Sequence, residues 1–131
     1  MSRAASFEDV TRHVDEFGDR AMLVSVTDSG APHVVSVVVE RADDRLLVRV
    51  GPGTRANVGT RPAVSLVWPP VDGGDYQLIV DGVATPTDDG VGDGEGPSAV
   101  SITVTSGILH RLAGLGGDAP SCVSLAADER E

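Results

Sequence analysis

The chain has 131 residues, the size of one domain, and is 40% hydrophobic but only 3% aromatic, so its core must consist mainly of Val, Leu, Ile and Ala. Its formal net charge of −10 argues against binding to nucleic acid or to an anionic membrane surface, because both need a basic footprint. All 10 basic residues are arginines, which excludes lysine Schiff-base chemistry and Walker-type phosphate loops.

The first predicted element is an amphipathic helix over residues 6–18, whose apolar residues recur at helical spacing and share one face. Ser6 followed by Asp9 is a variant of the capping box, and Gly18 is typical of a helix end.

Three strands separated by short turns follow, over residues 21–27, 33–40 and 45–50, and the short connections predict antiparallel neighbours. The second strand is almost continuous in valine, which predicts burial on both faces over part of its length. After the third strand, residues 54–60 predict a short helix capped by Thr54.

The rest of the chain predicts strands over residues 63–68, 76–85 and 99–105, with 108–112 continuing the last strand or leaving it. Gly82 inside a strand indicates a bulge. The glycine-rich, acidic segment 86–97 predicts a mobile loop, and 114–131 a partly disordered tail. Together the elements predict a mainly β domain with a six-stranded antiparallel barrel over residues 21–112 and two helices.

The cysteine content and the apolar runs of the sequence indicate a cellular location. The single cysteine, Cys122, cannot form an intrachain disulfide, which favours a reducing compartment. No apolar run approaches the ~20 residues of a membrane span, and the N-terminus shows no signal-peptide pattern. We therefore expect a cytoplasmic protein that does not enter a membrane.

The segment GPGTRANVGTRP, residues 51–62, is the best candidate for a binding site. Glycines such as Gly53 beside a helix start leave backbone N–H groups free to bind an anion. Thr54 adds a hydroxyl, Arg55 adds a bidentate cation, and Asn57 follows one turn later. Arg49 shares one face of the preceding strand with Arg45. The alternative is a structural strand-to-helix turn with a surface arginine.

Other candidates for chemistry are weaker. The three histidines, His13, His33 and His110, show no metal-ligand spacing. The acidic residues of segment 86–97 do not fit a calcium loop, so we expect no metal site. No serine lies in a nucleophile elbow, and Cys122 has no base beside it in the sequence.

The order of these motifs resembles the pyridoxamine-5′-phosphate-oxidase-like superfamily of flavin-binding split barrels. The resemblance runs from Ala21 to Leu112 and includes Gly-x-Gly-Thr-Arg-x-x-Asn after the third strand. It also includes Arg-Pro-x-x-Ser-Leu, Tyr-Gln-x-x-x-Asp-Gly and a closing Ile-Leu-His-Arg-Leu. It implies a six-stranded split β-barrel and a homodimer with two cofactor sites at the subunit interface.

The resemblance also implies a cofactor and the residues that hold it. Similar proteins bind the phosphate of FMN, or the tail of the deazaflavin coenzyme F-420, at the turn after the third strand. Carried over by position, the resemblance implies that Thr54 and Arg55 bind the phosphate, with Arg49 beside them. Asn57 matches a residue early in the helix, and Gln77 matches a glutamine that approaches the cofactor. Residues 35–37, from Val35 to Val37, would border the ring.

The chain departs from the family at Ala56, where many relatives have a lysine. The leading hypothesis is an FMN- or F-420-dependent oxidoreductase that transfers hydride to or from a small organic substrate, with no general acid or base identified. The first alternative is a non-catalytic module that binds flavin or haem, with His33 or His110 as haem ligand. The second is an unrelated small β-barrel in which residues 51–57 are structural, and the departure at Ala56 leaves a cofactor-free member of the family as a further alternative.

Overall fold

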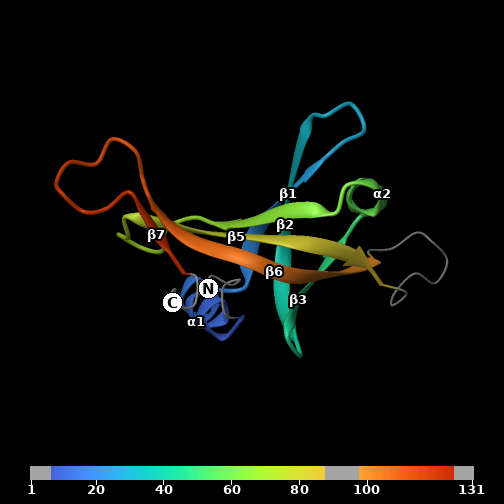
Figure 1. Ribbon diagram of the computed structural model, residues 1–131, viewed down its shortest axis with the longest axis horizontal. Coiled ribbons are helices and arrows are strands. Elements are labelled where there is room, and N and C mark those ends of the chain that lie inside the picture. Colours follow the sequence, from blue (N-terminus) through green and yellow to red (C-terminus); the bar gives the residue numbers. More distant parts are fainter. Residues whose placement is uncertain (1–6, 88–97, 126–131) are drawn as a thin grey trace, which may run out of the picture.

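The computed structural model describes residues 7–87 and 98–125. Within these ranges it is mainly β, with a closed six-stranded antiparallel barrel, one additional strand and two helices (Figure 1). In chain order the elements are α1 (Phe7–Phe17), β1 (Arg20–Val26), β2 (Pro32–Ala42), β3 (Arg45–Val50), α2 (Pro52–Thr60), β4 (Ala63–Trp68), β5 (Tyr76–Pro86), β6 (Ser98–Arg111) and β7 (Cys122–Ser124).

The strands form one sheet in the order β3-β2-β1-β4-β5-β6-β7, and an additional pairing between β3 and β6 closes the barrel. The neighbours β1, β2 and β3 are antiparallel, which confirms the prediction from their short turns. β7 pairs with the outer part of β6 and lies in the segment where the sequence indicated partial disorder. A strand of three residues carries too short a pattern to be recognised in the sequence.

The barrel interior holds the core, and the alternation along each strand decides which residues enter it. The largest fully buried side chains include Trp68, Leu23, Leu66 and Leu78. The Trp68 indole N–H donates a hydrogen bond of 2.8 Å to the carbonyl of Gly18, where α1 ends, so the helix is fixed to β4. Gly18 has φ +102°, which confirms it as the helix stop. The predicted capping residue Ser6 lies outside the described residues.

The valine-rich strand β2 corrects one expectation. Val37 and Val39 are buried, but Val34 is 53% and Val38 48% exposed. The prediction of burial on both faces is therefore wrong for the single chain, because no layer formed by residues 7–87 and 98–125 covers the outward face of β2.

Two local predictions have opposite outcomes. The register between β5 and β6 shifts between Asp81 and Gly82, which confirms the bulge. The prediction that Thr54 caps the second helix is wrong, because Gly51 is the N-cap and Pro52 begins α2. A proline at the first helical position loses nothing by lacking an N–H, so the helix starts there.

Several predictions concern parts of the chain that the structure does not describe. They include the tip of the acidic loop, residues 88–97, and the last part of the tail, residues 126–131. In the described ranges, no helix has the length and apolar character needed to cross a membrane.

Candidate functional site

Strands β2 and β3 separate at the barrel surface, and the candidate site occupies the gap. They pair only where Val39–Ala42 face Arg45–Val48. Towards the start of β2 and the end of β3, each strand keeps only its other neighbour. The backbone N–H of Val39 points to β1, since it donates to the carbonyl of Asp19 at 2.7 Å. Alternate residues point the opposite way, so the backbone groups of Ser36 and Val38 face the open gap.

At the end of the gap, beside the start of α2, lies a hollow of about 300 Å³ that we call the junction hollow. It joins the first half of β2 with the end of β3 and the first turn of α2. Its lining residues are His33, Val35, Ser36, Val37, Arg49, Val50, Gly51, Gly53 and Thr54. The structure thus brings together Val35, Arg49, Gly53 and Thr54 of the residues that the sequence indicated.

The first turn of α2 offers unpartnered backbone donors to this hollow. No side chain caps the helix, and Pro52 has no N–H. The N–H groups of Gly53 and Thr54 lie in the first turn, where a helix has no internal acceptor for them. A Cβ on Gly51 or Gly53 would meet nothing within 4 Å, so an anion can approach the backbone closely. The positive end of the helix dipole adds to this attraction.

Arg49 supplies the positive charge at the junction hollow. Its side chain is exposed, and it makes no hydrogen bond or ion pair with any residue that the structure describes. It lies on the outward face of β3 with Arg45, whereas Leu46, Val48 and Val50 point into the core, as the alternation predicted. A free guanidinium beside a helix N-terminus is a suitable arrangement for an oxyanion.

The side chain of Arg55 is engaged elsewhere. Its guanidinium donates to the carbonyl of Thr87 at 3.0 Å and to that of Ala99 at 3.5 Å, and it does not line the junction hollow. Asn57 donates from Nδ2 to the hydroxyl of Ser25 at 3.2 Å. Both residues therefore attach α2 to the barrel.

Gln77 lies apart from these residues within one chain. It is in the first part of β5, where it pairs with His110 of β6, and it does not line the junction hollow. The structure of one chain therefore does not bring Gln77 to the residues of the junction hollow.

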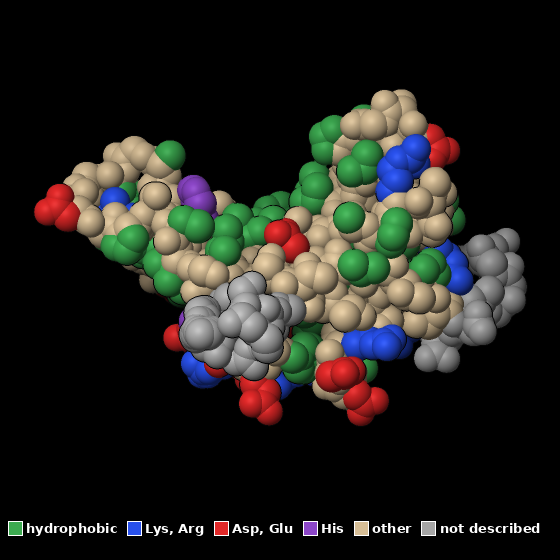
Figure 2. Space-filling view, in the orientation of Figure 1, with side chains coloured by type: hydrophobic (Ala, Val, Ile, Leu, Met, Phe, Trp, Pro, Cys, Tyr) green, Lys and Arg blue, Asp and Glu red, His purple; other side chains and the backbone are tan. Residues whose placement is uncertain are grey.

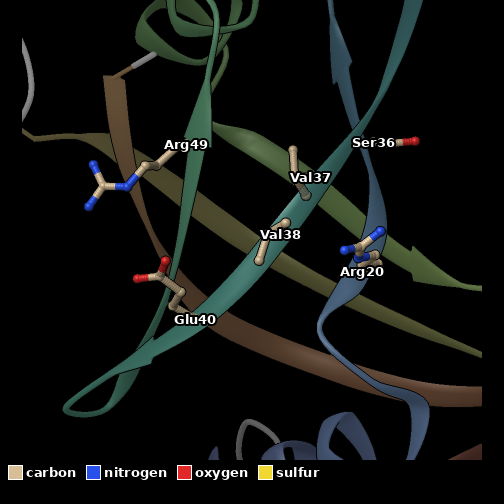
Figure 3. A pocket seen from close by; sticks show the side chains of 6 residues that line it. All are labelled: Arg20, Ser36, Val37, Val38, Glu40 and Arg49. Carbon is tan, nitrogen blue, oxygen red and sulfur yellow. The ribbon is translucent and has the colours of Figure 1, made fainter. Parts of the chain in front are cut away.

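A second hollow of about 510 Å³, which we call the strand hollow, adjoins the first along β2. Figure 3 shows its lining residues: Arg20, Ser36, Val37, Val38, Glu40 and Arg49. The two hollows share Ser36, Val37 and Arg49, so they form one continuous site. Sequence reasoning missed Arg20 and Glu40. Alternation along β1 gives only the face of Arg20, and it is the pairing with Val38 that places it at this hollow.

The residues of the joined hollows fit a phosphate-bearing cofactor with a planar ring. Arg49 and the first turn of α2 suit the phosphate, and Val35 and Val37 offer an apolar wall. The volumes of both hollows lie within the range of about 300–1,000 Å³ that is usual for small-molecule sites.

Comparison with known proteins finds relatives with similar sequences in mycobacteria. No protein-family model matches the chain. It is 36% identical over 101 residues to Uncharacterized protein MT0457 of Mycobacterium tuberculosis, and the match covers 70% of each chain. The values for Uncharacterized protein Mb0449c of Mycobacterium bovis are the same.

Similar solved structures have the same barrel at low sequence identity. A protein related to general stress protein 26, of the pyridoxinephosphate oxidase family of Clostridium acetobutylicum, has a TM-score of 0.67 at 12% identity, over 92% of this chain and 96% of that one. A haem-binding protein from Mycobacterium smegmatis has a TM-score of 0.63 at 16% identity, over 95% of this chain and 59% of that one. An F420 reductase has a TM-score of 0.55 at 15% identity, over 67% and 87%. The chain belongs to the family of the two mycobacterial proteins, and its fold is that of the pyridoxamine-5′-phosphate-oxidase-like split barrels.

Proposed function

We propose that this protein binds FMN or the deazaflavin F-420 and acts as an oxidoreductase on a small organic substrate. The observation that carries the proposal is the junction hollow, where a free guanidinium, unpartnered helix N–H groups and an apolar strand meet. The similarity in fold to an F420 reductase and to a member of the pyridoxinephosphate oxidase family supports the same class of cofactor.

In this proposal, Arg49 and the backbone of Gly53 and Thr54 hold the phosphate, and Val35 and Val37 border the ring. When bound, the cofactor supplies hydride transfer, and the chain supplies orientation and exclusion of water. Arg55 and Asn57 do not contact the phosphate in this proposal. They hold α2 in the position from which its first turn reaches the phosphate.

A titration of the purified protein with FMN and with F-420, followed by cofactor fluorescence, tests the proposal. We expect one of them to bind with a micromolar or lower Kd. Arg49→Gln is expected to weaken binding about 10-fold or more, since a hydrogen bond to a charged group contributes about 1.5–3 kcal/mol. Arg45→Gln is the matched control, because Arg45 lies on the same face of β3 but outside both hollows. If neither cofactor binds below high micromolar concentration, the proposal fails.

A second candidate function is haem binding without catalysis, which one specific observation favours. His33 is half-buried, lines the junction hollow and makes no hydrogen bond with the described residues. A solved haem-binding protein shares the fold. Addition of haem is then expected to give a Soret band that shifts in His33→Ala, whereas no shift would exclude His33 as the ligand.

A further inference from the structure

Most arginines in the described ranges have a hydrogen-bond or ion-pair partner, but two do not. Arg12, Arg41, Arg45 and Arg61 form ion pairs with Asp9, Asp15, Asp44 and Asp28. Arg55 and Arg111 donate to backbone carbonyls. Among the arginines of the described ranges, that leaves Arg20 and Arg49 without a partner in those ranges, and both line the strand hollow.

Two guanidinium groups that have no partner among the described residues thus line one hollow of a chain with a net charge of −10. Acidic side chains are abundant, and most arginines find one. A guanidinium kept free at a concave surface provides local positive potential, which attracts an anion that the rest of the molecule repels. The strand hollow therefore has the electrostatics of an anion site.

Arg20 and Arg49 occupy different ends of this hollow. Figure 3 shows Arg20 and Ser36 on one side of β2 and Arg49 and Glu40 on the other, with Val37 and Val38 between them. Arg49 also lines the junction hollow, where the proposed cofactor phosphate lies, but Arg20 does not. Arg20 is thus available to a second ligand beside the cofactor.

The lining of the hollow indicates what kind of anion this ligand carries. A guanidinium binds a carboxylate or a phosphate in bidentate geometry, but Arg20 carries one positive charge, which balances a carboxylate and only half of a phosphate dianion. Val38, which is exposed and pairs with Arg20, suits an apolar body attached to the charged group.

We propose that Arg20 binds the carboxylate of the substrate, which is a small organic acid with an apolar body lying over Val38. This inference rests on the proposed function, since it takes the junction hollow as the cofactor site. It assigns Arg20 to substrate specificity and not to cofactor binding.

The test is an NMR titration of the cofactor-loaded protein with hexanoate, with neutral hexanamide and with hexyl phosphate. Hexanoate is expected to shift the Arg20 Nε–H and the amide of Val38, and hexanamide is not. Arg20→Gln is expected to weaken hexanoate binding at least 10-fold, whereas the charge-matched control Arg45→Gln changes it less than 2-fold. Hexyl phosphate is expected to bind more weakly than hexanoate.

Cofactor affinity separates the two proposals. Arg20→Gln is expected to bind FMN or F-420 within 2-fold of the wild-type protein. If the wild-type protein binds a cofactor but hexanoate leaves the Arg20 Nε–H unshifted, or binds Arg20→Gln equally well, only the carboxylate assignment is wrong. Tighter binding of hexyl phosphate also overturns that assignment. If the wild-type protein binds neither cofactor, the proposed function itself fails.

Discussion

Gly82 shows how a single residue fixes the course of β5. A Cβ at this position would lie 2.6 Å from Cγ2 of Ile102 and 2.7 Å from the carbonyl oxygen of Thr103, so the bulge admits no side chain. We expect Gly82→Ala to destabilise the protein by about 1–3 kcal/mol, since overpacking forces the surrounding backbone to move. Thermal unfolding measures this. Gly59→Ala is the control, because the new Cβ meets nothing within 4 Å on α2. An unchanged melting temperature for Gly82→Ala would contradict this prediction, because it would show that β6 moves to make room for the new Cβ without loss of stability.

The residue scale also shows what a sequence can and cannot predict about the site. Arg49, Gly53, Thr54 and Val35, which the resemblance assigns to a cofactor, line one hollow. The same pattern could not reveal where the guanidinium of Arg55 points, because its acceptors, Thr87 and Ala99, are 32 and 44 residues away in the chain. Spacing predicts which residues share a segment. It does not predict which distant carbonyl a long side chain reaches.

At the scale of elements, Arg55 connects α2 to the barrel. Thr87 and Ala99, whose carbonyls it binds, follow β5 and begin β6, and the N–H of Thr87 also donates to the carbonyl of Ala99 at 3.0 Å. We expect Arg55→Ala to destabilise the protein by about 1.5–3 kcal/mol, because the carbonyls of half-buried Thr87 and buried Ala99 lose a charged donor. Cofactor affinity is expected to fall less than in Arg49→Gln. A larger loss of affinity with unchanged thermal stability would return Arg55 to direct phosphate contact. Thermal unfolding and the fluorescence titration measure the two effects.

The sequence predicted the barrel strands, because their residues follow a repeated pattern. It did not predict where two neighbouring strands stop pairing. Alternation and turn residues gave every strand of the barrel, and the run of β-formers gave β2. The separation of β2 from β3 was not predictable, because residues 33–38 are richer in β-formers than Val39–Ala42, yet only Val39–Ala42 pair with β3. That separation creates both hollows, so the site depends on the part of the fold that local propensity leaves open.

At the scale of the whole molecule, the barrel has an apolar outer face that the described residues leave partly exposed. Met22 pairs with Val67, Val67 with Ile79, and Ile79 with Ile108, so these residues form one row across β1, β4, β5 and β6. The row lies outside the barrel, since its neighbours in the chain, such as Leu23 and Leu66, are the buried ones. Figure 2 shows hydrophobic side chains gathered in the hollowed region between the β1–β2 hairpin and the loop after β6.

We propose that a second copy of the chain covers this face in a homodimer. Gln77 is two residues before Ile79 and so points to the same side of β5, and this arrangement gives it a route to the cofactor site of the other copy. We expect light scattering of the wild-type protein to give twice the mass of one chain. Val67→Glu is expected to give the mass of one chain and a weaker FMN or F-420 affinity, because a charge at the centre of the row cannot be buried without a partner. Val71→Glu adds the same charge at an exposed valine outside the row and is expected to remain a dimer. A wild-type protein of single-chain mass that still binds cofactor would show that one barrel forms the whole site and that Gln77 has no part in it.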